Sequence, residues 1–166
     1  MPEDRGNGPQ RPARLDDRQF LAVVEHAPLV SLDIVVRDPS GRVLLGFREN
    51  EPARHWWFVP GGRIAKNESL DDAFQRITRD ELGRAFDRAA AAFLGVYEHF
   101  YTAQPGGLTG SGTHYVALGY EVTASERLSP PREQHSRYDW FTVADLLAAK
   151  DVHPYTKTFF NGQPLP

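Results

Sequence analysis

The spacing of hydrophobic residues along this chain predicts helices separated by groups of strands. Hydrophobic positions at helical spacing fall in residues 15–27, 70–82 and 142–149. Extended hydrophobic runs, which we interpret as strands, fall in residues 29–38, 43–49, 56–62, 91–102, 114–123 and 138–141. We expect a polar connector over residues 125–137 and no regular element after Asp151. This order of elements is typical of an α+β fold with a mixed sheet.

The helix over residues 70–82 has the clearest signals. Leu70, Ala73, Phe74 and Ile77 form its predicted buried stripe, and Gly83 is a natural helix stop. The adjoining strands at 29–38 and 43–49 are joined by a Pro-Ser-Gly-Arg turn, so we expect them to form a hairpin. The Gly-rich segment 103–113 is either a hairpin connection or a lid.

Composition describes one ordinary globular domain. The 166 residues are 40% hydrophobic and 25% charged, which suits a single domain over residues 15–166. Residues 1–14 are rich in Pro, Gly and Arg, and we expect them to be a disordered tail. A net charge of -3 gives no electrostatic reason to expect a nucleic-acid or membrane partner. There are no cysteines, and we expect a cytoplasmic protein.

Charged residues around the predicted helix 70–82 allow two interpretations. Asp72, Arg76 and Asp80 are four residues apart and share one face, while Glu68 precedes the helix and Glu81 follows Asp80. The simpler interpretation is a solvated helix face held by ion pairs. The other is a site for Mg²⁺, which prefers oxygen ligands and commonly bridges substrate phosphates. Spacing alone favours the first interpretation.

The same residues resemble the Nudix box, G-x5-E-x7-R-E-U-x-E-E-x-G-U, where U is a bulky hydrophobic residue. Gly62, Glu68, Arg76, Glu81 and Gly83 match it. The chain departs from the box at three positions, with Ile77 in place of a Glu, Asp80 in place of a Glu and Arg84 in place of a hydrophobic residue. The resemblance implies a Nudix-like α/β/α sandwich with a mixed sheet.

Further segments resemble one subgroup, the GDP-mannose mannosyl hydrolases, which also lack the acid at the Ile77 position. These segments are APLVSLDIVV, LLGFREN, WWFVPGGR, GVYEHFY, THYVALGY and EQHSRYDW. The resemblance implies hydrolysis of GDP-mannose, or of GDP-glucose, to GDP and free sugar. Water attacks C1 of the sugar with inversion, and Mg²⁺ is the cofactor, for which Mn²⁺ can substitute.

The resemblance also implies roles for individual residues. His135 is the expected catalytic base, and an imidazole is suited to proton transfer near neutral pH. Arg48 and Tyr115 are expected to act on the leaving diphosphate. The remaining expected roles are metal binding for Gly61, Glu81 and Gln134, substrate binding for Asp33, Arg63 and His99, and a supporting network for Glu68, Arg76 and Asp80. Family members form dimers, and we expect a homodimer here.

Two other functions stay open at this point. The first is a Nudix pyrophosphatase that attacks phosphorus in a nucleoside diphosphate derivative, which the acids Asp80 and Glu81 favour and Ile77 opposes. The second is a non-catalytic module that binds a nucleotide sugar. Reaction products separate the two hydrolases, because attack at carbon releases GDP and attack at phosphorus releases GMP.

Overall fold

A computed structural model describes residues 15–102, 112–126, 128–131 and 135–161. Within this part of the chain seven strands form one mixed sheet. Five of them lie side by side in the order β3 (Trp57–Phe58), β2 (Val43–Arg48), β1 (Leu29–Arg37), β6 (Thr113–Thr123) and β5 (Ala92–Tyr101). The other two pair outside this row: β4 (Gly61–Arg63) with β1, and β7 (His135–Phe141) with β2. The neighbours β1 and β6 are parallel, and the other pairs are antiparallel. The expected α+β fold with a mixed sheet is therefore confirmed.

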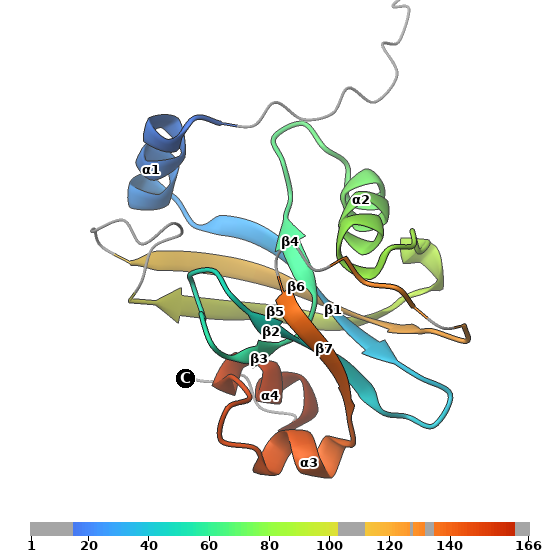
Figure 1. Cartoon of the computed structure of the whole chain (residues 1–166). Coiled ribbons are helices and arrows are strands. Elements are labelled where there is room, and N and C mark those ends of the chain that lie inside the picture. The colour runs from blue at the N-terminus through green and yellow to red at the C-terminus, as the bar shows by residue number, and fades with distance from the viewer. Residues whose placement is uncertain (1–14, 103–111, 127, 132–134, 162–166) are drawn as a thin grey trace, which may run out of the picture.

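Helices lie on both sides of this sheet (Figure 1). The helices are α1 (Asp17–His26), α2 (Leu70–Leu82), α3 (Val143–Ala148) and α4 (Pro154–Asn161), with a short 3-10 turn η1 (Arg88–Ala90). Helix α2 covers one face of the sheet, and α3 and α4 lie on the opposite side.

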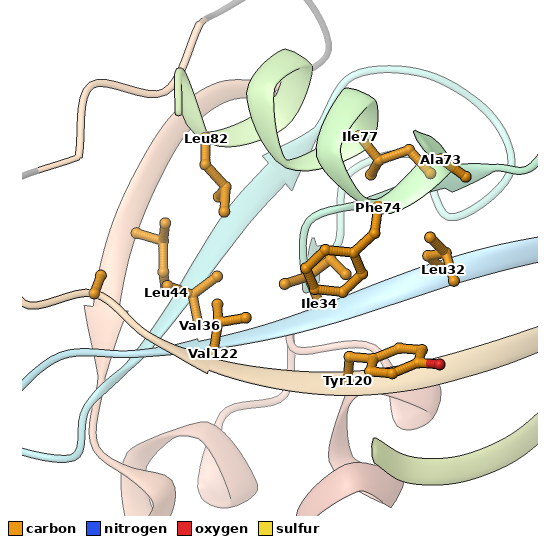
Figure 2. Close-up of a cluster of buried hydrophobic side chains, with 11 residues drawn as sticks. Leu32, Ile34, Val36, Leu44, Ala73, Phe74, Ile77, Leu82, Tyr120 and Val122 are labelled. Carbon is orange, nitrogen blue, oxygen red and sulfur yellow. The ribbon is translucent and has the colours of Figure 1, made fainter. Parts of the chain in front are cut away.

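The two faces of the central strands supply two hydrophobic clusters. Leu32, Ile34 and Val36 of β1 pack with Phe74 and Ile77 of α2 (Figure 2). The second cluster contains Val35 of β1, which alternation of side chains along a strand places on the other face. Its remaining buried members are Val43, Leu45, Ala53, Trp57, Phe58, Val59, Leu146 and Val152. The sheet thus forms the middle layer between α2 and the C-terminal helices.

Helix α2 matches the predicted range and end point. Ala73, Phe74 and Ile77 are buried as expected, and Gly83 ends the helix in the left-handed conformation with φ of 74°. The expectation that Leu70 is buried was wrong, because its side chain at the first helical position is 38% exposed.

Three segments differ from the sequence-based expectation. Residues 56–62 contribute to two short strands, because the chain changes neighbour there: β3 pairs with β2 and β4 pairs with β1. Pro60, between them, has no N–H to donate, but its carbonyl accepts from Ile34 of β1 at 2.8 Å. The polar connector ends earlier than expected, since β7 already begins at His135, opposite Arg48 of β2. Helix α4 follows Asp151, where we expected no element, and begins at a proline, the residue preferred at a first helical position.

Some predictions concern residues outside the described ranges. These are the disordered tail at 1–14 and the lid or connection over most of 103–113. The strands that flank this connection, β5 and β6, are antiparallel neighbours as expected. No helix among the described residues is long and apolar enough to cross a membrane.

Candidate active site

Glu68, which precedes α2, and Arg76 within α2 form an ion pair with two hydrogen bonds. The guanidinium of Arg76 donates to both carboxylate oxygens of Glu68, at 2.6 and 2.8 Å, and to the carbonyl of Arg63 at 2.9 Å. These contacts lower the pKa of Glu68 below its usual value, chiefly through the Arg76 hydrogen bonds. Asp80 is 3.9 Å from Arg76 and half exposed. The network therefore connects β4 to α2 across the intervening turn.

Ile77 lies in the core and not at the polar end of the helix. Its side chain is 1% exposed. A Cβ built on Gly62 would lie 3.2 Å from the Cγ1 of Ile77, so the absence of a side chain at Gly62 lets β4 pack closely on α2. The position where the Nudix box has a Glu therefore serves hydrophobic packing in this chain.

Glu81 and His135 meet beneath α2. The Oε2 atom of Glu81 lies 3.6 Å from Nδ1 of His135, and both side chains are almost fully buried. Burial raises the pKa of Glu81 to about 7, against the lowering effect of the Arg48 charge. Burial lowers the pKa of His135 to about 4, and Arg48 contributes to the same shift. His135 is thus a neutral imidazole in the unliganded protein.

Tyr138 contacts the imidazole of His135. Its hydroxyl lies 3.2 Å from the carbonyl of Pro131, 3.4 Å from that of Glu81 and 3.0 Å from Nδ1 of His135. When the hydroxyl donates to either carbonyl, its oxygen accepts the Nδ1 proton of the imidazole. The lone pair is then on Nε2, which is buried without a hydrogen-bond partner among the described residues. An oriented imidazole with a free lone pair is suited to act as a base.

Gly46 provides the space for this imidazole. A Cβ built on Gly46 would lie 2.4 Å from Cδ2 of His135, well inside van der Waals contact. The ring therefore rests directly on the backbone of β2, and any side chain at Gly46 would displace it.

Arg48 links the two faces of the sheet electrostatically. Its charge acts on the pKa values of Glu81 and His135 beneath α2, and on those of Asp33 and His153 beside α4. One hydrogen bond, from Nε to the carbonyl of Pro52 at 2.9 Å, orients the guanidinium. Its terminal nitrogens donate no hydrogen bond within the described ranges, so they are open to an anionic ligand.

Asp33 and His99 form a second polar pair. The Oδ2 atom of Asp33 lies 3.8 Å from Nδ1 of His99, and both side chains are buried. Burial raises the pKa of Asp33 to about 7 and lowers that of His99 to about 4, so near neutral pH the imidazole is uncharged and the carboxyl exchanges between its protonated and ionised forms. Asp33 Oδ2 and His99 Nε2 have no hydrogen-bond partner among the described residues. Buried polar atoms left unpaired are costly, which indicates a binding site.

Tyr115 and Arg63 lie near this pair. Tyr115 of β6 is opposite His99 of β5, and burial raises the pKa of its hydroxyl, while the charges of Arg63 and Arg48 lower it. The guanidinium of Arg63 is stacked 4.1 Å above the ring of Phe20 in α1. The structure therefore brings Asp33, Arg48, Arg63, His99 and Tyr115 into one neighbourhood.

The expected metal ligands are described only in part, since Gln134 lies outside the described ranges. Gly61 of β4 pairs with Asp33, and no group of three or more His, Cys, Asp or Glu side chains suited to a metal occurs among the described residues. The expected set contains only one such side chain. Glu81 does fit a cation, because its Oε2 is buried and unpartnered among described residues, and a nearby positive charge would stabilise it.

Comparison with known proteins identifies the family. A model of the NUDIX domain matches residues 27–161. The chain belongs to the NUDIX family. It is 40% identical over 163 residues to the low-salt glycan biosynthesis protein Agl8 of Haloferax volcanii, covering 98% of this chain and 99% of that protein. This membership supports hydrolase activity, of the kind that generally uses divalent ions such as Mg²⁺.

Solved structures agree with this assignment. A MutT NUDIX hydrolase from Burkholderia pseudomallei is similar with a TM-score of 0.66 and 28% identity, covering 81% of this chain and 96% of that one. The NUDIX domain of Shewanella oneidensis NrtR, solved in complex with ADP ribose, gives a TM-score of 0.58 at 21% identity and covers 83% of this chain and 90% of that domain. The second likeness supports the fold alone.

Several residues of this site were not selected from the sequence. Gly46 contacts His135 only through the pairing of β2 with β7, so nothing in its local sequence marks it. Tyr138 lies three residues after His135 on β7, but its hydroxyl contact depends on the conformation of that strand. Tyr101 lies 6.2 Å from the ring of His99 and is also buried. An aromatic residue in a strand is indistinguishable from a core residue until the partner strands are known.

Proposed function

We propose that this protein hydrolyses GDP-mannose, or the closely similar GDP-glucose, to GDP and free sugar in the presence of Mg²⁺. Two observations carry the proposal. The box position of Ile77 is part of the core, and the imidazole of His135, whose Nδ1 lies 3.6 Å from Oε2 of Glu81, has no hydrogen-bond partner at Nε2 among the described residues. A phosphorus-attacking site would need an acid where Ile77 lies, while attack at carbon needs only a base on the open side of the sugar.

In the proposed step the leaving GDP does not need to be protonated. Nε2 of His135 takes a proton from water as the water oxygen bonds to C1 of the sugar. The bond between C1 and the diphosphate oxygen breaks at the same time, and its electrons leave with GDP. Because water enters opposite the leaving group, the configuration at C1 inverts. Arg48 faces the departing diphosphate and compensates its negative charge.

Glu81, the carbonyl of Gly61 and Gln134 are the proposed ligands of Mg²⁺. When bound, the metal would supply positive charge at the diphosphate oxygens. Asp33 and His99 are proposed to bind sugar hydroxyls, because their buried unpaired atoms need neutral polar partners. Tyr115 and Arg63 are proposed to contact the diphosphate.

The name of the relative supports a sugar substrate. Agl8 is described as a glycan biosynthesis protein, and glycans are assembled from activated sugars, so an enzyme acting on a nucleotide sugar is consistent with that description. The proposal extends this chemistry to the present chain through 40% identity over nearly the whole length.

Product identification tests the proposed reaction. We would incubate the purified protein with GDP-mannose and Mg²⁺, separate the nucleotides by chromatography, and follow the released anomer by NMR. GDP with free mannose of inverted configuration is the expected result. GMP with mannose 1-phosphate would instead establish attack at phosphorus and move Asp80 and Glu81 to the centre of the mechanism. Omitting Mg²⁺ should abolish turnover.

We also propose a homodimer formed through the uncovered part of the sheet. Phe93, Val96 and Phe100 on the edge strand β5 are 56%, 58% and 60% exposed. Their antiparallel partners on β6, Tyr120, Leu118 and His114, are separated by even numbers of residues and so share one face. A row of exposed hydrophobic side chains on one face fits a protein interface.

A further inference from the structure

His153 is a polar residue near the Asp33 and His99 pair, and neither the sequence nor the proposed function gives it a role. It immediately precedes α4, and its Nδ1 accepts a hydrogen bond from the backbone N–H of Tyr155 at 3.2 Å. An imidazole that accepts at Nδ1 and is neutral carries its proton on Nε2. Burial lowers the pKa of His153 to about 4, helped by the Arg48 charge, so the ring is neutral.

The Nε2 proton of His153 is available to a ligand. Within the described part of the chain, no hydrogen bond from Nε2 is found, although Nδ1 and the backbone N–H of the residue are both satisfied. The side chain is partly exposed, so its free nitrogen is not sealed in the core. His153 therefore presents one uncharged donor with a fixed tautomer.

His153 and His99 share the same aromatic surroundings. Phe58 contacts both imidazoles, with ring centroids 5.3 Å from His153 and 6.1 Å from His99. The ring centroid of Tyr101 lies 5.7 Å from that of His153 and 6.2 Å from that of His99. The ring centroid of Tyr155 lies 5.0 Å from that of His153 and 4.3 Å from that of His99. The two imidazoles are also close enough for His153 to contribute to the lowered pKa of His99. They belong to one cluster, built from β5, β3 and the start of α4.

The chemistry of this cluster suits a sugar better than a phosphate. It contains the Asp33 carboxyl, which would repel a phosphate when ionised, and neutral imidazoles that exchange single hydrogen bonds with hydroxyl groups. Its walls are aromatic rings, which pack against the apolar face of a hexose. The phosphate-binding charges, Arg48 and Arg63, border the cluster and do not form it.

From this geometry we propose that His153 is a sugar-binding residue, donating its Nε2 proton to a hydroxyl of the hexose held by Asp33 and His99. The inference rests on the proposed function and extends it, because it assigns part of the sugar site to the C-terminal helix α4. The ordinary role that competes with it is helix capping, since the hydrogen bond to Tyr155 satisfies one N–H of the first turn of α4.

Two variants separate sugar binding from capping and packing. His153→Asn keeps a side chain that caps helices well and removes the imidazole. His153→Phe keeps an aromatic ring against Trp56 and Phe58 and removes the cap. The imidazole donor is missing from both variants. Thr142→Asn, the same replacement at the N-cap of the neighbouring helix α3, is the matched control, because Thr142 lies outside the cluster.

The measurements are kcat/KM for GDP-mannose, the inhibition constant of GDP, and the thermal unfolding midpoint. We expect kcat/KM to fall about 10- to 100-fold in both His153 variants, which is the usual effect of losing one buried hydrogen bond to a ligand, with the GDP constant unchanged within about threefold. Thr142→Asn should leave both constants unchanged.

Each contrary outcome has a separate meaning. If the wild-type protein releases GDP and both His153 variants keep its kcat/KM, the inference is wrong and the proposed function stands. If only His153→Phe is impaired and its unfolding midpoint falls, the residue is a helix cap. If GDP binding weakens as much as kcat/KM, His153 contacts the nucleotide and not the sugar. A wild-type protein that releases no GDP overturns the proposed function, and this inference with it.

Discussion

Gly46 shows how closely one residue of this site depends on the backbone beneath it. The imidazole of His135 lies on Gly46 so tightly that a Cβ there would be 2.4 Å from Cδ2. The ring also contacts Tyr138, whose hydroxyl oxygen lies 3.0 Å from Nδ1. A base in contact with both a strand backbone and a tyrosine has its free nitrogen in a fixed direction, as proton transfer requires.

Gly46→Ala should therefore act through His135 alone. The added methyl group must push the ring aside, and a misplaced base costs roughly 100-fold in kcat. His135→Gln, which removes the base, should cost about 10²- to 10⁴-fold. The check is a double-mutant cycle on kcat for the hydrolysis of GDP-mannose. In the His135→Gln background, Gly46→Ala should have no further effect, whereas an additive loss would mean that Gly46 acts by another route.

At the scale of elements, the turn before α2 is fastened by one ion pair. Glu68 is bound by two nitrogens of Arg76 and by the N–H of Ala65, and its carboxylate is nearly buried. Arg76 also reaches the carbonyl of Arg63. This pair thereby sets the position of β4, with Gly61, relative to the helix that carries Glu81.

Glu68→Gln should destabilise the fold by roughly 1–3 kcal/mol at pH 7, the range for hydrogen bonds to charged groups. The pKa of Glu68 is lower in the folded chain than in the unfolded chain. Between these two pKa values the unfolded chain therefore binds more protons than the folded chain, and stability falls as the pH falls. The advantage of wild type over Glu68→Gln is then complete above the usual pKa of 4.5 and disappears as the pH falls through the lowered value.

Urea unfolding at pH 7, 5 and 3 measures this difference. The control is Asp71→Asn in the same helix, which removes the exposed ion pair to Arg88 and should change stability less than Glu68→Gln does. Equal losses in the two variants, or a Glu68→Gln loss that persists unchanged at pH 3, would contradict the assignment.

The sequence predicted elements well where their signals were local. The boundaries of α2 follow from a hydrophobic stripe and a glycine stop, both readable within one stretch of chain. The burial of His135 does not, because its neighbours Gly46 and Glu81 are distant in sequence and meet it only after β2 and β7 pair. Flanked by polar residues, His135 reads as part of a connector.

Helix α4 was missed for a related reason. Eight residues containing two threonines and a leading proline give weak helix propensity. The helix is held by contacts from elsewhere, with the hydroxyl of Tyr155 bonded to both the N–H and the carbonyl of Phe100 at 2.8 and 2.9 Å. His153 could not be assigned to the site until those long-range contacts placed α4 beside β5.

For the molecule as a whole, the two faces of the sheet differ in how completely they are covered. On one side α3 and α4 pack against the sheet through the second hydrophobic cluster, while α2 covers only part of the other face. Beyond α2, the edge strand β5 carries the exposed Phe93, Val96 and Phe100. A second copy of the chain that covers this row would bury it and also protect a sheet edge that is otherwise open to pairing.

Val96→Asp should therefore dissociate the proposed dimer, because a buried charge in an apolar interface lacks a partner. Leu70→Asp is the matched control: Leu70 is also an exposed hydrophobic residue, at 38%, but it lies at the start of α2, where a negative charge is favourable. Sedimentation equilibrium should give a dimer for wild type and Leu70→Asp and a monomer for Val96→Asp. A monomeric wild type would refute the dimer, and a dimeric Val96→Asp would place the interface elsewhere. Because Val96 projects to the face opposite Tyr97 and His99, the monomer should retain GDP-mannose hydrolysis if each site is complete within one chain.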